Sequence, residues 1–215
     1  MSQNVPINPK IYHIVHIDKL AAILERKALI SDEEISRNPP IGTTIGMTAI
    51  KKRRLKEITL SSHPSLFVGQ CVPFYFCSRS VMLYLFHMNN HPDIIYRGGQ
   101  NPILHLEADL RKVVEWAESN QRKWAFTLTN AGSSYFEDRA DLSLLAEINW
   151  NAVRARSWKN CREEKQAEFL MEQELPWELI DRIGVFSMSQ QVKAQRILDN
   201  DSQTMLIEVK KEWYY

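Results

Sequence analysis

The sequence predicts a single α+β domain in which most strands run antiparallel. A chain of 215 residues is long enough to bury one sizeable hydrophobic core. Segments typical of strands and of helices follow one another without the regular strand–helix–strand alternation of a parallel sheet. The composition, 44% hydrophobic and 25% charged, is that of an ordinary soluble globular protein.

Strands are predicted where β-branched and aromatic residues cluster or alternate with polar ones. In CVPFYFCSRS, for example, alternation places Val72, Phe74 and Phe76 on one face. The predicted strands comprise residues 11–17, 71–80, 101–108, 123–129, 167–171, 182–188 and 204–211.

Helices are predicted between several of these strands. Asp18 is expected to cap the first, whose face carries Leu20, Ile23 and Leu24. Further helices are predicted at residues 47–58, 109–120, 141–148 and 192–200, with loops at 36–46, 130–134 and 172–181.

Composition excludes some classes of protein. The formal net charge of +1 selects no class of partner. No run of about 18 apolar residues is present, and the amino-terminal MSQNVPINPK has no hydrophobic centre, so neither a membrane span nor a signal peptide is expected. Cys71, Cys77 and Cys161 lack CxxC spacing, which indicates a reducing compartment and argues against a structural zinc site.

Two histidines of the first predicted strand, His13 and His16, are three residues apart. In a strand this spacing points them to opposite faces, so they are not expected to share a metal ion. One core and one exposed histidine is the simpler interpretation. An inward His13 would still be able to donate a hydrogen bond to a ligand.

The run KKRRLK at residues 51–56 carries five positive charges. A solvated helix face is the simplest interpretation, and a grip on a phosphate backbone is the alternative. Helical phase aligns Arg54 with Ile50 and Ile58, so Arg54 is expected to point toward the apolar side and Arg53 outward. An inward guanidinium needs an anionic partner, either a phosphate or a carboxylate.

The second face of the strand predicted at 71–80 carries Tyr75, Cys77 and Arg79. An aromatic ring beside a cation suits the stacking of a base and the binding of a phosphate. A half-buried strand with an amphipathic tyrosine explains the pattern equally well. The motif RGGQNP, residues 97–102, indicates a tight turn before the next strand.

Glu168 lies at the start of the apolar run AEFLM. Strand alternation groups it with Gln166 and Leu170, opposite Phe169 and Met171. If both faces are covered, the carboxylate is enclosed and suited to stabilise a developing cation. Periodicity alone slightly favours a glutamate at a strand end that reaches solvent.

Six stretches together resemble the DarT family, in the order seen in that family. They are IYHIVHIDKLAAIL, IKKRR, VPFYFCSRSVMLY, YRGGQNPILHL, EKQAEFL and KKEWYY, and the similarity extends from about residue 10 to residue 215. No GxGxxG, P-loop, GxSxG or HExxH motif points to another class of enzyme.

The resemblance implies an activity and a setting. DarT proteins are bacterial toxins that cleave NAD, without a metal ion, and transfer ADP-ribose to a thymine base in single-stranded DNA, which blocks replication. The implied fold has two small, mostly antiparallel sheets that form an NAD cleft, with peripheral helices. The implied partners are single-stranded DNA and the antitoxin DarG, and a cytoplasmic monomer is expected.

The resemblance also implies roles for residues within one domain spanning 1–215. The family's catalytic glutamate corresponds to Glu168, and its catalytic arginine, to which the family assigns deprotonation of thymine, corresponds to Arg54. The implied NAD contacts are His13, Ile14, Val15, Ala22, Ile30 and Arg54. The implied DNA contacts are Tyr75, Arg79 and Met82. The NAD-binding element corresponds to residues 38–56 and the substrate-presenting loop to residues 119–168, both approximately.

The sequence departs from the family pattern at two positions. Family members can carry a histidine in the loop after the strand at 123–129, where this chain has NAGSS with Asn130, and position 22 is Ala where Gly is common. The preferred DNA sequence therefore stays open. Two alternatives also stay open, an ADP-ribosyltransferase that acts on RNA or protein and a non-catalytic nucleic-acid-binding module.

Overall fold

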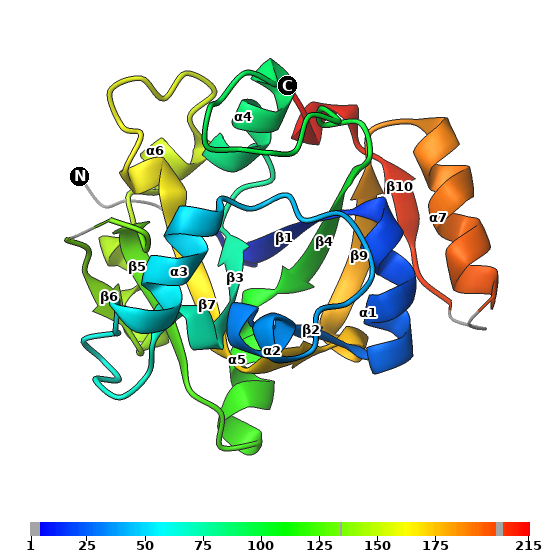
Figure 1. Ribbon diagram of the computed structural model, residues 1–215. Helices are drawn as coiled ribbons and strands as arrows, with labels where there is room; N and C mark the ends of the chain where they lie inside the picture. Colours follow the sequence, from blue (N-terminus) through cyan, green and yellow to red (C-terminus); the bar gives the residue numbers. More distant parts are fainter. Residues whose placement is uncertain (1–4, 134, 201–203) are drawn as a thin grey trace.

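The structure is a computed structural model that describes residues 5–133, 135–200 and 204–215 (Figure 1). Residues 1–4 of the amino-terminal segment, Ser134 of the predicted turn and residues 201–203 lie outside the described part. The described strands are β1 (Lys10–His16), β2 (Ala28–Ile30), β3 (Cys71–Tyr75), β4 (Ile103–Asp109), β5 (Trp124–Asn130), β6 (Asp138–Arg139), β7 (Ala167–Glu172), β8 (Glu174–Pro176), β9 (Ile180–Val185) and β10 (Ile207–Val209).

Helices surround these strands. The described α-helices are α1 (Leu20–Arg26), α2 (Asp32–Arg37), α3 (Thr48–Lys56), α4 (Val81–Met88), α5 (Leu110–Ser119), α6 (Trp150–Arg154) and α7 (Met188–Asn200). The described 3-10 helices are η1 (Ile17–Lys19), η2 (Val68–Gln70), η3 (Leu142–Glu147), η4 (Glu164–Gln166), η5 (Trp177–Leu179) and η6 (Lys211–Trp213).

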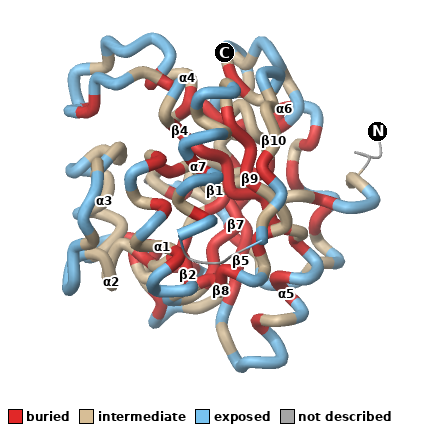
Figure 2. The backbone as a smooth tube through the Cα atoms, turned by 90° about the vertical axis from the view of Figure 1, so that its right-hand side faces the viewer, coloured by how far each residue is buried: buried red, intermediate tan, exposed pale blue. Residues whose placement is uncertain are grey.

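The predicted α+β class with mostly antiparallel strands is confirmed. Eight strands form one sheet in the order β10-β9-β4-β1-β3-β7-β5-β6, and β2 pairs with β8 in a second, smaller sheet. Among the described pairs only β10 and β9 run parallel. The buried backbone is concentrated in the strands of the large sheet, with exposed segments around them (Figure 2).

The large sheet consists of two halves joined at one residue pair. Strand β1 pairs with β4 along its whole length, but it pairs with β3 only at Tyr12–Tyr75. Beyond Tyr12 the two strands diverge, and the edge of β1 that faces β3 is left open. The two sheets that were expected to flank a cleft are thus present as two halves of one sheet.

Alternation along β7 sets which side chains face the core. Ala167, Phe169 and Met171 pack in the main hydrophobic core. Leu170 faces the other way, into a second cluster with Ile58 and neighbouring residues. Helices α2 and α3 lie together over β3 on that second side (Figure 1), so a side chain in phase with Leu170 points toward α3.

Several local predictions were wrong, among them the loop at 172–181, which contains β8 and η5. Asp18 does not cap α1, because its carboxylate instead accepts hydrogen bonds from the backbone N–H (3.1 Å) and hydroxyl (2.6 Å) of Thr43. The strand predicted at 71–80 ends at Tyr75, and helix α4 follows it. Ser80 caps α4 by accepting a hydrogen bond from Leu83 N–H over 3.1 Å. The continuous apolar run VMLYLF hid this helix because it shows no clear period.

Candidate functional site

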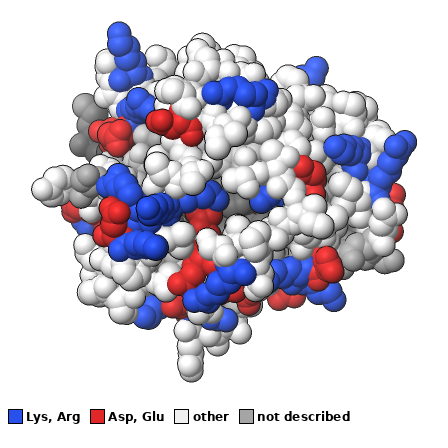
Figure 3. Space-filling view, viewed as in Figure 1, with Lys and Arg blue, Asp and Glu red and all other residues white. Residues whose placement is uncertain are grey.

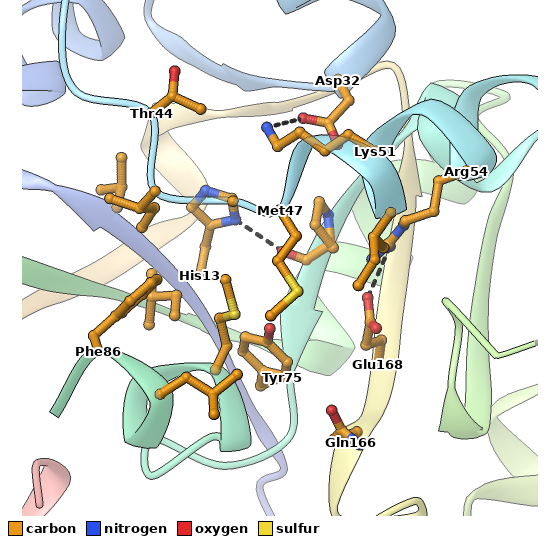
Figure 4. A pocket seen from close by; sticks show the side chains of 18 of the residues that line it. His13, Asp32, Thr44, Met47, Lys51, Arg54, Tyr75, Phe86, Gln166 and Glu168 are labelled. Carbon is orange, nitrogen blue, oxygen red and sulfur yellow. Dashed lines mark hydrogen bonds and ion pairs between the residues drawn. The ribbon is translucent and has the colours of Figure 1, made fainter. Parts of the chain in front are cut away.

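A cavity of about 450 Å³ opens where β1 and β3 diverge. This volume is in the range usual for small-molecule sites. Strands β1, β3 and β7, helices α3 and α4 and the loop after α2 supply its walls, and Figure 4 shows the side chains that point into it. In the view of Figure 1 the surface is hollowed near its centre, with basic and acidic side chains gathered on one side (Figure 3).

Glu168 lies inside this cavity. It is only 4% exposed and shares a face of β7 with Leu170, as alternation predicts. The interpretation as a solvent-reaching strand end is therefore wrong, because α3 covers this face. An Arg54 Nη2–Glu168 Oε2 ion pair of 2.8 Å offsets part of the cost of burying the carboxylate.

Arg54 reaches Glu168 from α3, as helical phase predicts. Its side chain is 12% exposed, whereas that of Arg53 is 41% exposed and lies 3.7 Å from Glu57. Burial acts to lower the pKa of Arg54, but the charge of Glu168 and its hydrogen bond prevail and raise it above the ordinary value. Arg54 is thus a permanent cation in this site, suited to bind an anion rather than to accept a proton.

At a bulge beside Glu168, a hydrogen bond to a side chain replaces a backbone hydrogen bond between two strands. Strand β5 pairs with β7 at Phe126–Phe169 and again at Asn130–Ala167, so three residues of β5 lie opposite one residue of β7, Glu168. The Glu168 N–H therefore donates to Thr127 Oγ1 over 2.9 Å, and that hydroxyl donates to the Thr129 carbonyl over 2.6 Å. Thr127, which is fully buried, fixes the backbone that carries the carboxylate.

His13 lies on the opposite wall. Its Nδ1 is 2.8 Å from the Pro73 carbonyl. Since a carbonyl only accepts, Nδ1 carries the proton and Nε2 is left as an acceptor. Burial lowers the pKa of His13, which keeps the ring neutral. The two histidines diverge as predicted. His13 lines the cavity, whereas His16 does not, and its Nδ1 lies 2.8 Å from the Asp18 carboxylate.

The other residues that the resemblance assigned to NAD lie close by. Ile14, Val15 and Ile30 line the same cavity. Ala22 lines a smaller adjoining cavity of about 100 Å³, which also touches His13. The loop before α3, within the predicted element 38–56, contributes residues 43–47 to the main cavity.

The three positions assigned to DNA are separated. Tyr75, directly across from Glu168 in the β3–β7 register, and Met82 line the cavity. Arg79 does not line it, because β3 ends at Tyr75 and the predicted alternation stops there. The Arg79 guanidinium instead lies over the ring of Tyr215, 4.4 Å from its centroid. Cys77, also predicted on that face, lies 3.7 Å from Lys165 Nζ.

Sequence reasoning missed Asp32 and Phe86, which line the cavity. Lys51 Nζ and Asp32 Oδ1 form a 2.6 Å ion pair in the wall, visible in Figure 4, and Phe86 and Asn130 line it elsewhere. One signal was available, because SDEE at residues 31–34 matches a helix N-terminus in which Ser31 accepts from Glu34 N–H over 3.4 Å. That signal predicts α2, the helix that places Asp32 in the wall of the cavity.

Within the described residues, no group of three or more His, Cys, Asp or Glu side chains is arranged to hold a metal ion. The three cysteines are all unpaired. None of the described helices is both long and apolar enough to cross a membrane.

Comparison with known proteins gives consistent matches. The family model described as "ssDNA thymidine ADP-ribosyltransferase, DarT" matches residues 12–215. A DNA ADP-ribosyl transferase of Thermus aquaticus is 35% identical over 212 residues, which is 98% of this chain and 90% of the relative. The structure of Thermus sp. 2.9 DarT with ADP-ribosylated ssDNA superposes with a TM-score of 0.89 at 32% identity, covering both chains completely. The same protein with NAD+ gives a TM-score of 0.82 at 30% identity, covering 99% of this chain and 100% of that one.

Proposed function

The chain belongs to the DarT family of single-stranded DNA thymidine ADP-ribosyltransferases, and from this premise we propose that it transfers ADP-ribose from NAD to a thymine base in single-stranded DNA. The observation that carries the proposal is the buried Glu168–Arg54 ion pair facing a cavity of about 450 Å³. The reaction breaks the bond between nicotinamide and ribose C1′. It forms a bond from C1′ to a thymine ring nitrogen, and one proton leaves that nitrogen.

Glu168 is proposed to stabilise the cationic sugar. As nicotinamide departs, positive charge develops on the ribose, and a fixed carboxylate in a water-poor site stabilises that charge. Its burial and its rigid attachment through Thr127 support this role. The Arg54 partner keeps the carboxylate oriented until the substrate takes its place.

Arg54 is proposed to act on the anionic groups of the reaction. Thymine N3 becomes a nucleophile only as it loses its proton, and the planar guanidinium suits both a diphosphate and a developing thymine anion. The raised pKa of Arg54 argues against a literal role as base. We therefore assign it to electrostatic stabilisation, with removal of the proton by water or another acceptor.

The cavity wall formed by β1 is proposed to hold NAD. Beyond Tyr12 the edge of β1 does not pair with β3, so alternate backbone groups within residues 13–15 are available on that side. The His13 Nε2 acceptor and the apolar Ile30 add contacts in the same cavity, and Ala22 in the adjoining one. Tyr75 and Met82, beside Glu168, are proposed to position the target base.

We further propose two segments with separate tasks in one domain. Residues 38–56, approximately, bind NAD. Residues 119–168, approximately, present the substrate, and this segment carries β5, α6 and the cavity residues Arg162, Glu163 and Gln166.

The family resemblance also supports a biological setting. We propose that the protein is a cytoplasmic toxin countered by a DarG antitoxin. Induced expression of the wild-type chain should stop DNA synthesis in a bacterial host. Expression of Glu168→Gln should not, and growth unaffected by either chain would contradict the toxin role.

The activity itself is tested by incubating the protein with NAD and short oligonucleotides with or without thymine, followed by intact mass measurement. A gain of one ADP-ribose on thymine-containing strands alone is expected, and fragmentation locates the base. Consumption of NAD without DNA modification would indicate an RNA or protein acceptor. No consumption of NAD would overturn the proposal.

A further inference from the structure

A buried lysine lies three residues before Glu168. Lys165, in η4, is only 2% exposed, and among the lysines and arginines of the described residues it alone is buried. None of the ion pairs in the described part of the chain includes it. A charge removed from water without an opposite charge beside it is costly, so its presence here calls for an explanation.

The Lys165 ammonium group meets two neutral acceptors. Its Nζ donates to the Val153 carbonyl over 2.9 Å and lies 3.7 Å from Cys77 Sγ. The Cys77 thiol in turn donates to the Arg79 carbonyl over 3.6 Å, and burial raises the pKa of Cys77, which favours the neutral thiol. A neutral donor would satisfy the Val153 carbonyl without the cost of burying a charge. The needs of that carbonyl therefore do not account for a lysine at this position.

The two acceptors belong to segments that are far apart in the sequence. Val153 lies in the last turn of α6, where carbonyls lack a partner within the helix. Cys77 lies two residues after Tyr75, the end of β3. Lys165 itself belongs to η4, which packs against α6 and β5. One ammonium group thus joins the ends of α6 and β3 to the turn that leads into β7.

The other side of this turn lines the cavity. Arg162, Glu163 and Gln166 all contribute to the cavity wall, whereas Lys165 does not. The Gln166 N–H donates to the Glu163 carbonyl over 3.0 Å, which closes the turn. Gln166 then leads along the chain to Glu168, and Figure 4 shows both side chains at the cavity. Lys165 therefore holds from behind a turn whose front is part of the site.

The contact also bears on the relative position of two strands. Tyr75 on β3 lies directly across from Glu168 on β7. Lys165 precedes Glu168 by three residues, and its partner Cys77 follows Tyr75 by two. A shift of either strand end would move Tyr75, proposed to position the base, relative to the carboxylate. Reaction rates fall steeply when reacting groups are misplaced by as little as about 1 Å.

We propose that Lys165 is a positioning residue for the transfer to DNA, which fixes the end of β3 against the turn before β7 and so holds Tyr75 and Glu168 in the arrangement that presents thymine to the ribose. The inference rests on the proposed function and deepens it, by adding a residue that lies outside the cavity. A lysine suits this task because its ammonium group carries three donors and can hold acceptors from two segments at once.

The first test measures where the ADP-ribose goes. Lys165→Met keeps a long, flexible side chain but removes the ammonium group. Wild type and variant receive NAD and an oligonucleotide with one thymine, and modified DNA and free ADP-ribose are both quantified. When the base is misplaced, water takes its place at the cationic ribose and gives free ADP-ribose. We expect the ratio of modified DNA to free ADP-ribose to fall about tenfold in Lys165→Met.

This ratio separates positioning from folding. A smaller fraction of folded protein lowers both products equally, so a loss of stability alone leaves the ratio unchanged. Lys112→Met is the matched control, because it removes a lysine on α5 whose side chain is 65% exposed, and it should keep the wild-type ratio. The rise in Tm produced by NAD should be the same in Lys165→Met and wild type, because Lys165 does not line the cavity.

The second test concerns the partner of Lys165. Cys77→Val removes one of the two acceptors and should lower the ratio, whereas Cys77→Ser retains an acceptor and should lower it less. In the double variant Lys165→Met with Cys77→Val the ratio should be no lower than in Lys165→Met alone, since both changes remove the same contact.

Several results would overturn the positioning role. One is an unchanged ratio in Lys165→Met, whatever the total activity. Another is full additivity in the double variant, or equal losses in the Val and Ser variants of Cys77, since either would assign the effect to packing. A smaller NAD-induced rise in Tm in Lys165→Met would assign Lys165 to NAD binding instead. Wild-type protein that modifies no thymine strand would overturn the proposed function, on which this role depends.

Discussion

Two regions of the molecule, the cavity between the halves of the large sheet and the β4–β9 strand pair, hold the same three kinds of charged or titratable residue. The cavity set consists of Glu168 on β7, Arg54 on α3 and His13 on β1. The β4–β9 set consists of Glu107 on β4, Arg182 on β9 and His105 on β4. Both glutamates are almost completely buried and each pairs with its arginine, at 2.8 Å for Glu168 and 2.6 Å for Glu107.

The surroundings of the two sets differ. Arg182 lies directly across from Glu107 on the neighbouring strand, and it also pairs with Glu208 at 2.6 Å, beneath the ring of Trp213. Neither Glu107 nor Arg182 lines either of the two cavities described above. Arg54, in contrast, comes from a helix outside the sheet, and its ion pair with Glu168 lies in the wall of the cavity.

Burial and ion pairing therefore do not identify a catalytic carboxylate by themselves. Buried pairs are a general way to keep a charge inside a fold. What distinguishes Glu168 is the empty volume beside it and an arginine that a ligand can displace without unpairing strands. The predictions below test this distinction.

The largest effect is expected from the two glutamates. Glu168→Gln should lower kcat for thymine modification about a thousandfold, since it removes the charge proposed to stabilise the cationic ribose. Glu107→Gln should leave kcat within about twofold and instead lower the free energy of unfolding by about 2 kcal/mol, because Arg182 loses a charged hydrogen-bond partner. Turnover by mass spectrometry and urea unfolding measure the two quantities.

The pair of variants is its own control. Equal losses of activity in both would mean that each glutamate acts through folding. Glu168→Gln with wild-type turnover would remove the catalytic assignment, whatever the stability of Glu107→Gln.

A second prediction concerns acid stability and the β4–β9 set. Burial lowers the pKa of His105 to about 4, and its Nε2 is 2.8 Å from the Ser78 carbonyl. Above pH 6.5 the ring is neutral in both states and contributes nothing to the pH dependence. Below pH 6.5 the unfolded chain binds a proton that the folded chain does not, so the free energy of unfolding falls by up to about 3 kcal/mol as pH approaches 4.

His105→Gln tests this origin, because the glutamine amide can still donate to the Ser78 carbonyl but does not titrate. Urea unfolding at pH 7 and pH 4.5 should show a smaller loss of stability in this variant than in the wild type. Identical losses would assign the acid sensitivity to other groups, among them His13, whose pKa burial also lowers.

The arginines provide a third, smaller contrast. Arg54→Lys keeps the charge but loses the planar fork, and it should lower kcat/KM about thirtyfold. Arg182→Lys should leave kcat/KM unchanged, since Arg182 pairs with Glu107 and Glu208 and lines neither of the two cavities described above. Steady-state kinetics on one thymine oligonucleotide measure both, and full activity in Arg54→Lys would contradict its proposed role.

Part of this contrast was predictable from the sequence. Helical phase separated Arg54 from Arg53 because α3 is a regular helix, and alternation grouped Glu168 with Leu170 because β7 is a regular strand. The burial of Glu168 was not predictable, since its cover and its ion-pair partner lie 114 residues away in the chain. Arg79 was misplaced for a local reason, because β3 ends at Tyr75 and residues 76–79 bend toward Ser80, the cap of helix α4.

The smallest predicted effect concerns how each glutamate is held by its backbone. Glu107 pairs with neighbouring strands on both sides, at Tyr12 and at Arg182, whereas the bulge in β5 leaves the Glu168 N–H to the side chain of Thr127. Thr127→Val leaves that buried N–H without an acceptor, and the strand should shift to find one. We expect kcat to fall about fivefold, roughly 1 kcal/mol in the barrier, with KM for NAD little changed.

Thr127→Ser retains the hydroxyl and should restore kcat, which separates positioning of Glu168 from loss of packing around Thr127. Equal losses in the Val and Ser variants would assign the effect to packing. A loss confined to KM would show that Thr127 supports the binding of NAD instead. With either result, the cavity alone would distinguish the Glu168 set from the β4–β9 set. Rescue by serine would add a second difference, because the backbone at Glu168 is held by a side chain where the backbone at Glu107 is held by neighbouring strands.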